Sequence, residues 1–193
     1  MERTILHGTL VRIMTRGVLL LGDSGSGKSL FALSLLYDGG RLVSDDVVEV
    51  FRRGVDLFGR TPGSRKVDGK VGRSSGGGGQ LKDTRGLLEV RGVGIVDIGR
   101  VLGPSFVIEK SKIDLAVRLG VPKGALGADG NSEDTRGCFG VNAGEFELLG
   151  VSVPEISFSE TIDPKRLVTA ITDFILCGSQ NSAVLKELLG NNG

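Results

Sequence analysis

The feature that most constrains this chain is a glycine-rich segment that joins an apolar stretch to an amphipathic one. Residues 22–29 read Gly-Asp-Ser-Gly-Ser-Gly-Lys-Ser and fit the pattern G-x-x-x-x-G-K-[ST]. The preceding residues 17–21 resemble a strand buried in the middle of a sheet, and residues 28–37 carry apolar side chains at helical spacing. A strand, a glycine turn and a helix in this order predict an α/β fold with a phosphate-binding P-loop.

The chemistry of the segment follows from its residue types. Glycines let the backbone N–H groups surround a phosphate, and the start of the following helix adds further free N–H donors. Lys28 supplies a positive charge for the β- and γ-phosphates, and Ser29 offers a hydroxyl to a divalent metal. The alternative, a glycine turn that holds no ligand, is disfavoured by the placement between strand and helix. We therefore expect ATP and Mg²⁺ to bind the residues Gly22, Asp23, Ser24, Gly25, Ser26, Gly27, Lys28 and Ser29.

Two adjacent carboxylates, Asp45 and Asp46, follow the next apolar stretch, residues 41–44. Ligands of α/β sheets gather at the carboxyl ends of strands, where an NTPase places a metal-binding or basic carboxylate. Adjacent residues of a strand point to opposite faces, so we expect only one of the two to face the phosphate. The simpler alternative is a solvated turn or a helix cap.

The rest of the chain predicts a mostly β sheet closed by helices. A hairpin is expected over residues 47–51 and 55–58, and a half-buried strand over residues 113–119. A glycine tract at residues 72–79 predicts a mobile loop. The further predicted elements are a strand at 5–14 interrupted at His7-Gly8, an apolar stretch at 87–98, strands at 145–149 and 151–158, and helices at 164–177 and 182–189.

Composition narrows the function classes. The 193 residues suit one domain, residues 1–193, and a net charge of +1 with 8 Phe, 1 Tyr and no Trp argues against nucleic acid as a partner. No apolar run is long enough to span a membrane. The two cysteines, Cys138 and Cys177, have no metal-ligand spacing and are expected to be reduced, as in a cytoplasmic protein.

Three segments together resemble the HPr kinase/phosphorylase family. Residues 7–11 read His-Gly-Thr-Leu-Val, an opening that the family shares, and residues 41–46 read Arg-Leu-Val-Ser-Asp-Asp, close to the family's R-L-V-A-D-D. Residues 89–98 are similar to the signature E-[IV]-R-G-[LV]-G-[IL]-[IV]-D-[IV] at every position. The resemblance covers the chain from His7 to about Thr172 and corresponds to the family's C-terminal catalytic domain, without the N-terminal regulatory domain of longer members.

The resemblance implies roles for individual residues. Asp46, or alternatively Asp45, would take the proton from the acceptor serine, and by microscopic reversibility would return it in the reverse reaction. Lys28 would bind phosphate, and Arg136, in a segment similar to the family's D-R-L-G, would stabilise charge on the transferring group. The remaining roles are Mg²⁺ binding by Ser29 and Glu89, and a place near the phosphates for His7.

The implied activity is that of an ATP-dependent serine kinase acting on the phosphocarrier protein HPr, in a homo-hexamer. The family also attacks phosphoserine with inorganic phosphate, through a segment similar to P-V-R-P-G-R. Residues 161–166 here read Thr-Ile-Asp-Pro-Lys-Arg, and the carboxylate of Asp163 would repel an incoming phosphate, so we expect phosphorolysis to be weak or absent. Two alternatives stay open: a kinase of the same fold acting on a small-molecule hydroxyl, and a regulatory module that senses ATP.

Overall fold

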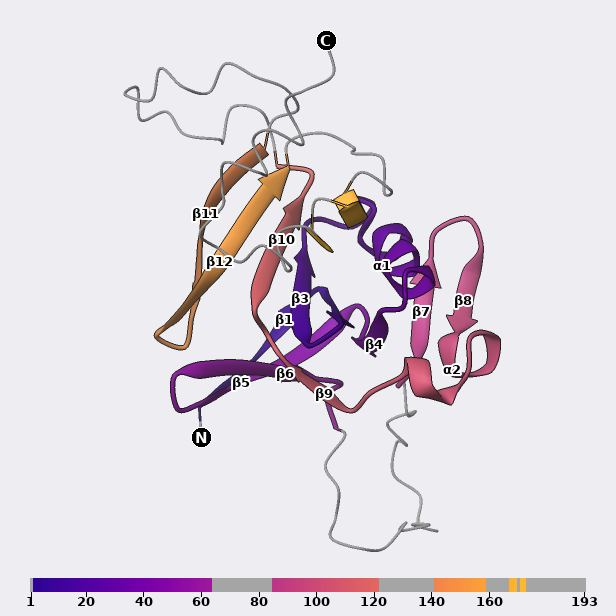
Figure 1. Cartoon of the computed structure of the whole chain (residues 1–193), viewed down its shortest axis with the longest axis horizontal. Helices are drawn as coiled ribbons and strands as arrows, with labels where there is room; N and C mark the ends of the chain where they lie inside the picture. The colour runs from indigo at the N-terminus through magenta and orange to yellow at the C-terminus, as the bar shows by residue number, and fades with distance from the viewer. Residues whose placement is uncertain (1, 64–84, 122–140, 159–166, 170, 173–193) are drawn as a thin grey trace, which may run out of the picture.

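A computed structural model of the chain shows a mixed α/β fold that is mostly sheet (Figure 1). It describes residues 2–63, 85–121, 141–158, 167–169 and 171–172. Among these residues no helix is long and apolar enough to cross a bilayer.

The central element is a six-stranded sheet in the order β11-β12-β10-β3-β2-β4. Strand β10 pairs in parallel with both β3 and β12, whereas β2 pairs antiparallel with β3 and β4, and β11 antiparallel with β12. The bounds are β2 (Thr9–Ile13), β3 (Arg16–Leu21), β4 (Arg41–Ser44), β10 (Leu115–Leu119), β11 (Val141–Leu148) and β12 (Val151–Phe158).

A second sheet of four antiparallel strands, in the order β1-β5-β6-β9, and a separate β7–β8 hairpin complete the β-structure. Their bounds are β1 (Arg3–His7), β5 (Val47–Arg53), β6 (Asp56–Arg60), β7 (Leu87–Val90), β8 (Gly94–Asp97) and β9 (Lys110–Lys112). The helices are α1 (Lys28–Tyr37), the short α2 (Ile98–Val101) and the 3₁₀ turn η1 (Pro104–Phe106). Figure 1 shows α1 between the central sheet and the β7–β8 hairpin.

Two hydrophobic cores lie on opposite faces of the central sheet. Alternate side chains of β3 enter each core: Val18 and Leu20 pack with α1 and β7, and Leu19 and Leu21 pack with the four-stranded sheet. All four are less than 10% exposed, as expected for a strand covered on both sides. The described chain is therefore layered in the order β7–β8 hairpin, α1, central sheet and second sheet. β3 lies in the middle of the central sheet and ends at Leu21, directly before the glycine turn.

The structure confirms most of the predicted elements. The helix at 28–37, the strands at 41–44, 17–21 and 151–158 and the hairpin over 47–58 form with nearly the predicted bounds. The strand predicted at 5–14 is two strands, β1 and β2, which belong to different sheets, and the strand predicted at 145–149 is β11, which begins four residues earlier at Val141. The strand predicted at 113–119 forms as β10, over Leu115–Leu119, but the prediction that it is half-buried is wrong. Val117 of β10 packs in the core beside α1 and Ala116 in the core beside the second sheet, because layers cover both faces. The apolar stretch at 87–98 is the β7–β8 hairpin.

Several predictions fall outside the described residues. The glycine tract at 72–79, the cysteines Cys138 and Cys177, and the helix at 182–189 lie there entirely. Of the helix predicted at 164–177, residues 167–169 and 171–172 are described, and they are helical.

Close packing at Gly17 gives a test of the layered arrangement. A Cβ at Gly17 would lie 1.8 Å from the backbone oxygen of Lys112 in β9. We expect Gly17→Ala to lower the free energy of unfolding by about 1–3 kcal/mol, measured by urea denaturation, because the backbone cannot move aside without separating β3 from β9. The matched control is Gly144→Ala, where a Cβ meets nothing within 4 Å, and equal stability of the two variants would contradict the packing.

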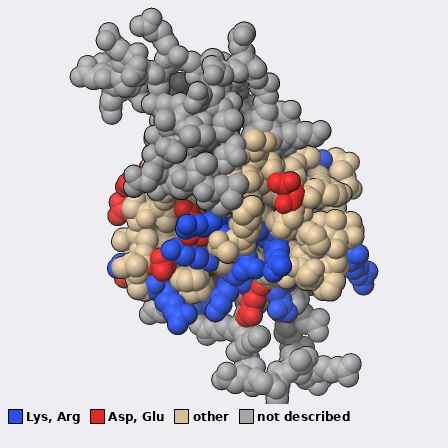
Figure 2. Space-filling model, in the orientation of Figure 1, with Lys and Arg blue, Asp and Glu red and all other residues tan. Residues whose placement is uncertain are grey.

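The outer face of the second sheet gathers cations, visible where β5, β6 and β9 lie (Figure 2). Glu49 is buried among them, accepting from Arg60 Nε at 2.9 Å and from Arg3 Nη1 at 3.2 Å. The hydrogen bond from Arg60, which outweighs the effect of burial, lowers the pKa of the Glu49 carboxyl below its ordinary value of 4.5. The native state thus favours the charged carboxylate.

We therefore expect Glu49 to stabilise the fold above about pH 4.5 and to lose that contribution as pH falls through its lowered pKa. Glu49→Gln should reduce stability at pH 7 by about 1–2 kcal/mol and flatten the loss between neutral and acid pH. Thermal melts of both proteins across pH 3–7 measure this. If stability depended on pH equally in the wild type and in Glu49→Gln, the ionisation of Glu49 would not be coupled to folding.

Candidate functional site

The segment at residues 22–29 forms the turn from the end of β3 into α1, and its backbone requires glycine. Gly25 and Gly27 adopt left-handed φ angles of +87° and +95°, and Gly22 has φ +139°. A Cβ at Gly22 would also lie 2.5 Å from the Leu119 carbonyl oxygen. These glycines let the chain turn tightly against β10 while the first N–H groups of α1 stay without intrahelical partners.

Lys28, the first residue of α1, is folded into this turn. Its Nζ donates to the carbonyl oxygens of Gly22 at 2.6 Å and of Asp23 at 2.8 Å, and the residue is 7% exposed. Burial lowers the pKa of the ammonium, against the opposing attraction of Asp45, Asp23 and Asp46. The turn thus holds the Lys28 ammonium in place, and the nearby carboxylates oppose the effect of burial on its pKa.

Asp45 joins three elements through both carboxylate oxygens. Oδ1 accepts from the buried Thr9 Oγ1 at 2.6 Å, and Oδ2 accepts from the Glu89 backbone N–H at 2.9 Å. The carboxylate therefore connects β2 and the end of β4 with the β7–β8 hairpin. Both carboxylate oxygens are therefore occupied by donors of the protein itself.

Asp46 differs from Asp45 in its backbone conformation, its partners and its exposure. Its backbone has φ +65°, its carbonyl accepts from the Gly8 N–H at 3.0 Å, and its Oδ1 lies 3.1 Å from His7 Nδ1. The side chains of His7 and Asp46 are 52% and 66% exposed. The structure thus brings His7 and Asp46 together as a solvent-exposed pair at one end of β1. Asp45, by contrast, is half-buried and accepts a hydrogen bond on each carboxylate oxygen.

The β7–β8 hairpin brings two further residues toward the glycine turn. Glu89 is exposed on β7, and Arg91 follows in the turn with its guanidinium against Gly25. Arg91 and Asp97 do not pair in the described part of the chain: Asp97 lies opposite Leu87 at the other end of the hairpin and pairs with Arg100 at 3.4 Å. The contact with Gly25 was not predicted. The available signal was the position of Arg91 in the glycine-rich turn two residues after Glu89.

Both predicted Mg²⁺ ligands, Ser29 and Glu89, are among the described residues. Within the described ranges, no group of three or more His, Cys, Asp or Glu residues could hold a metal ion. Mg²⁺ at a nucleotide site needs only one or two protein ligands beside substrate phosphates and waters, which the half-buried Ser29 and the exposed Glu89 fit in chemistry. Arg136 lies outside the described residues.

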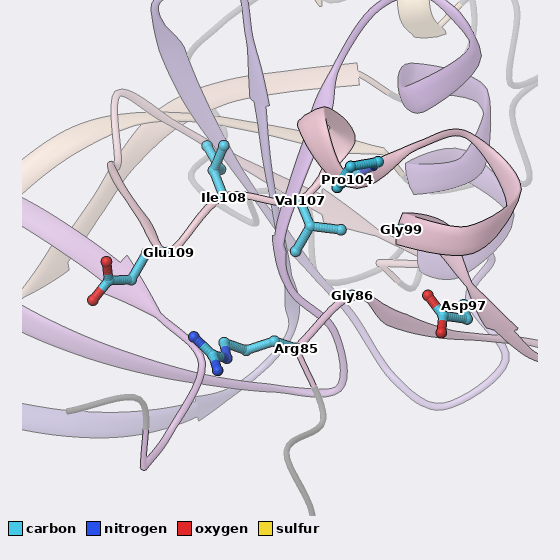
Figure 3. A pocket seen from close by; sticks show the side chains of 8 residues that line it. All are labelled: Arg85, Gly86, Asp97, Gly99, Pro104, Val107, Ile108 and Glu109. Carbon is cyan, nitrogen blue, oxygen red and sulfur yellow. The ribbon is translucent and has the colours of Figure 1, made fainter. Parts of the chain in front are cut away.

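A pocket of about 460 Å³ lies elsewhere, beside α2 and η1 (Figure 3). Figure 3 shows the side chains of Arg85 and Glu109 at one end and Asp97 at the other. None of the predicted site residues is among those that line it. This pocket is therefore separate from the candidate site.

The two hydrogen bonds of Asp45 predict a structural role for it that Asp46 does not share. Asp45→Ala should cost about 1–3 kcal/mol of stability and speed amide hydrogen exchange at Glu89, because the N–H and the Thr9 hydroxyl lose their partner. Asp46→Ala is the matched control, since its carboxylate is largely exposed. Equal exchange rates at Glu89 in the two variants would contradict this division.

Comparison with known proteins places this arrangement in a family. Residues 1–67 match the family described as "HPr Serine kinase C-terminal domain". The HPr kinase/phosphorylases of Streptococcus pneumoniae strains Hungary19A-6 and 70585 are each 36% identical over 159 residues, which cover 80% of this chain and 42% of the relative. The chain thus spans less than half the length of these curated relatives.

The fold has a solved counterpart. The structure described as "Structure of the Hpr(Ser) kinase/phosphatase from Coxiella burnetii" superposes with a TM-score of 0.67, covering 90% of this chain and 97% of that chain at 23% sequence identity. This likeness supports the mixed, mostly β architecture. The sequence matches support the HPr kinase/phosphorylase family through the family's C-terminal domain, and the solved structure supports the fold.

Proposed function

We propose that this chain is an ATP-dependent serine kinase unit that transfers the γ-phosphate of ATP to a serine of the phosphocarrier protein HPr. The observation that carries the proposal is the glycine turn at residues 22–29, which ends a buried strand, opens a helix and folds Lys28 into its centre. The S. pneumoniae relatives bear the name HPr kinase/phosphorylase, which supports HPr as the acceptor.

The glycine turn would act as the P-loop. Its N–H groups and those at the start of α1 would surround the β- and γ-phosphates, and Lys28 would exchange its carbonyl partners for phosphate oxygens. Ser29 and Glu89 would hold Mg²⁺, which neutralises charge on the phosphates when bound. Little covalent chemistry is needed from the protein, because positioning and charge stabilisation dominate phosphoryl transfer.

Asp46 is the better candidate for the base. Both oxygens of Asp45 already accept hydrogen bonds from the protein, whereas Asp46 is open to solvent and contacts only His7 among the described side chains. A base must reach the serine hydroxyl of a second protein, and a side chain that is 66% exposed can do so. His7 would orient the carboxylate, and in the reverse direction the protonated Asp46 would act as the acid.

The open setting of this pair also favours a bulky acceptor over a small one. Small-molecule sites usually enclose most of their ligand. His7 and Asp46, at 52% and 66% exposure, leave room for a protein surface carrying a serine. Three further expectations carry over from the sequence: charge stabilisation by Arg136 and a homo-hexamer from the family resemblance, weak phosphorolysis from the carboxylate of Asp163, and a cytoplasmic setting from the two cysteines.

The test is phosphate transfer with defined acceptors. We expect the protein with Mg²⁺ and γ-labelled ATP to phosphorylate HPr on serine. Lys28→Ala should lower the rate by about 10²–10³-fold through lost charge stabilisation. Asp46→Asn should lower it by about 10²–10⁴-fold while ATP still binds.

The exposed Glu147 of β11 offers a matched control, and Glu147→Gln should behave as the wild type. Label that appears on a metabolite and not on HPr would assign the protein as a small-molecule kinase. Saturable ATP binding without any transfer would assign it as a sensor. Full activity of Asp46→Asn would show that Asp46 is not the base.

A further inference from the structure

Arg91 occupies a position that the proposed roles leave unexplained. It lies in the turn between β7 and β8, and its Nη1 would be 2.5 Å, and its Cζ 3.6 Å, from a Cβ at Gly25. Among the described residues, apart from the chain neighbours of Gly25, no other atom comes within 4 Å of that Cβ position. The guanidinium therefore lies directly over the middle of the glycine turn, in the space that a side chain at residue 25 would fill.

The charge of Arg91 is not neutralised by the protein where the structure describes it. No hydrogen bond or ion pair of its side chain occurs among the described residues, and Asp97, opposite Leu87 at the other end of the hairpin, is engaged by Arg100 through both oxygens. Lys28, a second cation, points into the same turn. Two positive groups converging on a turn lined with N–H donors make a site suited to an anion with several charges.

The backbone that leads into Arg91 is held by contacts of β7. Leu88 and Val90 of β7 are buried in the core beside α1, and the Glu89 N–H is bound to Asp45 at 2.9 Å. The turn itself is closed by the Val93 N–H, which donates to the Val90 carbonyl at 2.9 Å. The guanidinium is therefore presented to Gly25 by backbone that is fixed to the central fold.

We propose that Arg91 contacts the polyphosphate of the bound nucleotide, as a second cation opposite Lys28. The planar guanidinium can bind two phosphate oxygens at once, which an ammonium cannot do with the same geometry. The inference rests on the proposed nucleotide site. Two reasons then account for glycine at position 25. The φ of Gly25, +87°, favours glycine, and the Arg91 guanidinium occupies the space that a Cβ would need.

The direct test is calorimetric titration of the full chain with a non-hydrolysable ATP analogue and Mg²⁺. We expect Arg91→Gln to weaken binding by about 10- to 100-fold and Arg91→Lys to restore part of the loss. The matched control is Arg41→Gln, which removes an exposed arginine at the far end of β4, and it should bind as the wild type. Unchanged affinity of Arg91→Gln would overturn the inference.

A double-mutant cycle with Gly25→Ala separates direct contact from general charge. Backbone strain at φ +87° affects Gly25→Ala equally in both backgrounds, whereas displacement of the guanidinium occurs only when Arg91 is present. We expect Arg91→Gln to cost clearly less affinity in the Gly25→Ala background than alone. Strictly additive losses would contradict contact at Gly25. Failure of the wild type to bind the analogue would refute the nucleotide site itself, a result distinct from equal binding by wild type and Arg91→Gln.

Discussion

The carboxylate of Asp45 is the interaction on which the site's geometry depends. One oxygen accepts from Thr9 at 2.6 Å in the central sheet, and the other accepts from the Glu89 N–H at 2.9 Å in the β7–β8 hairpin. Among the described residues the hairpin is otherwise held by apolar packing, in which Leu88 and Val90 of β7 and Val96 of β8 join the core beside α1. A charged acceptor that is shared by two donors is a directional constraint, and packing alone does not supply one. It fixes Glu89 and the following turn relative to the end of β3.

The layered fold explains why the functional groups meet at one edge. β3 is buried on both faces and ends at Leu21, so the glycine turn leaves the sheet between α1 and β10. β4 ends at Ser44, directly before Asp45, and β1 ends at His7 next to Asp46. Each functional side chain thus follows the end of a strand whose position is set by core packing, which is the usual location of ligand sites in α/β sheets.

Local patterns predicted much of this arrangement, and long-range contacts account for what they missed. The bounds of α1 and β4 follow from apolar spacing and punctuation alone. Burial of both faces of β10 was missed because its alternating sequence does not reveal that a second sheet covers Ala116. The roles of Asp45 and Asp46 could not be assigned from sequence, since they depend on Thr9 and on Glu89, 44 positions away. The contact of Arg91 with Gly25 also joins residues far apart in the sequence, so local patterns do not predict it.

The account stands on the ability of main-chain amides at residues 22–29 to hold a polyphosphate. Backbone amide resonances followed by NMR during titration with ATP and Mg²⁺ test this most directly. The account predicts saturable shifts at Gly25, Gly27, Lys28 and Ser29, with the amides of β11 unmoved. Shifts confined to other surfaces, such as the pocket beside α2, or no shifts at all, would contradict it.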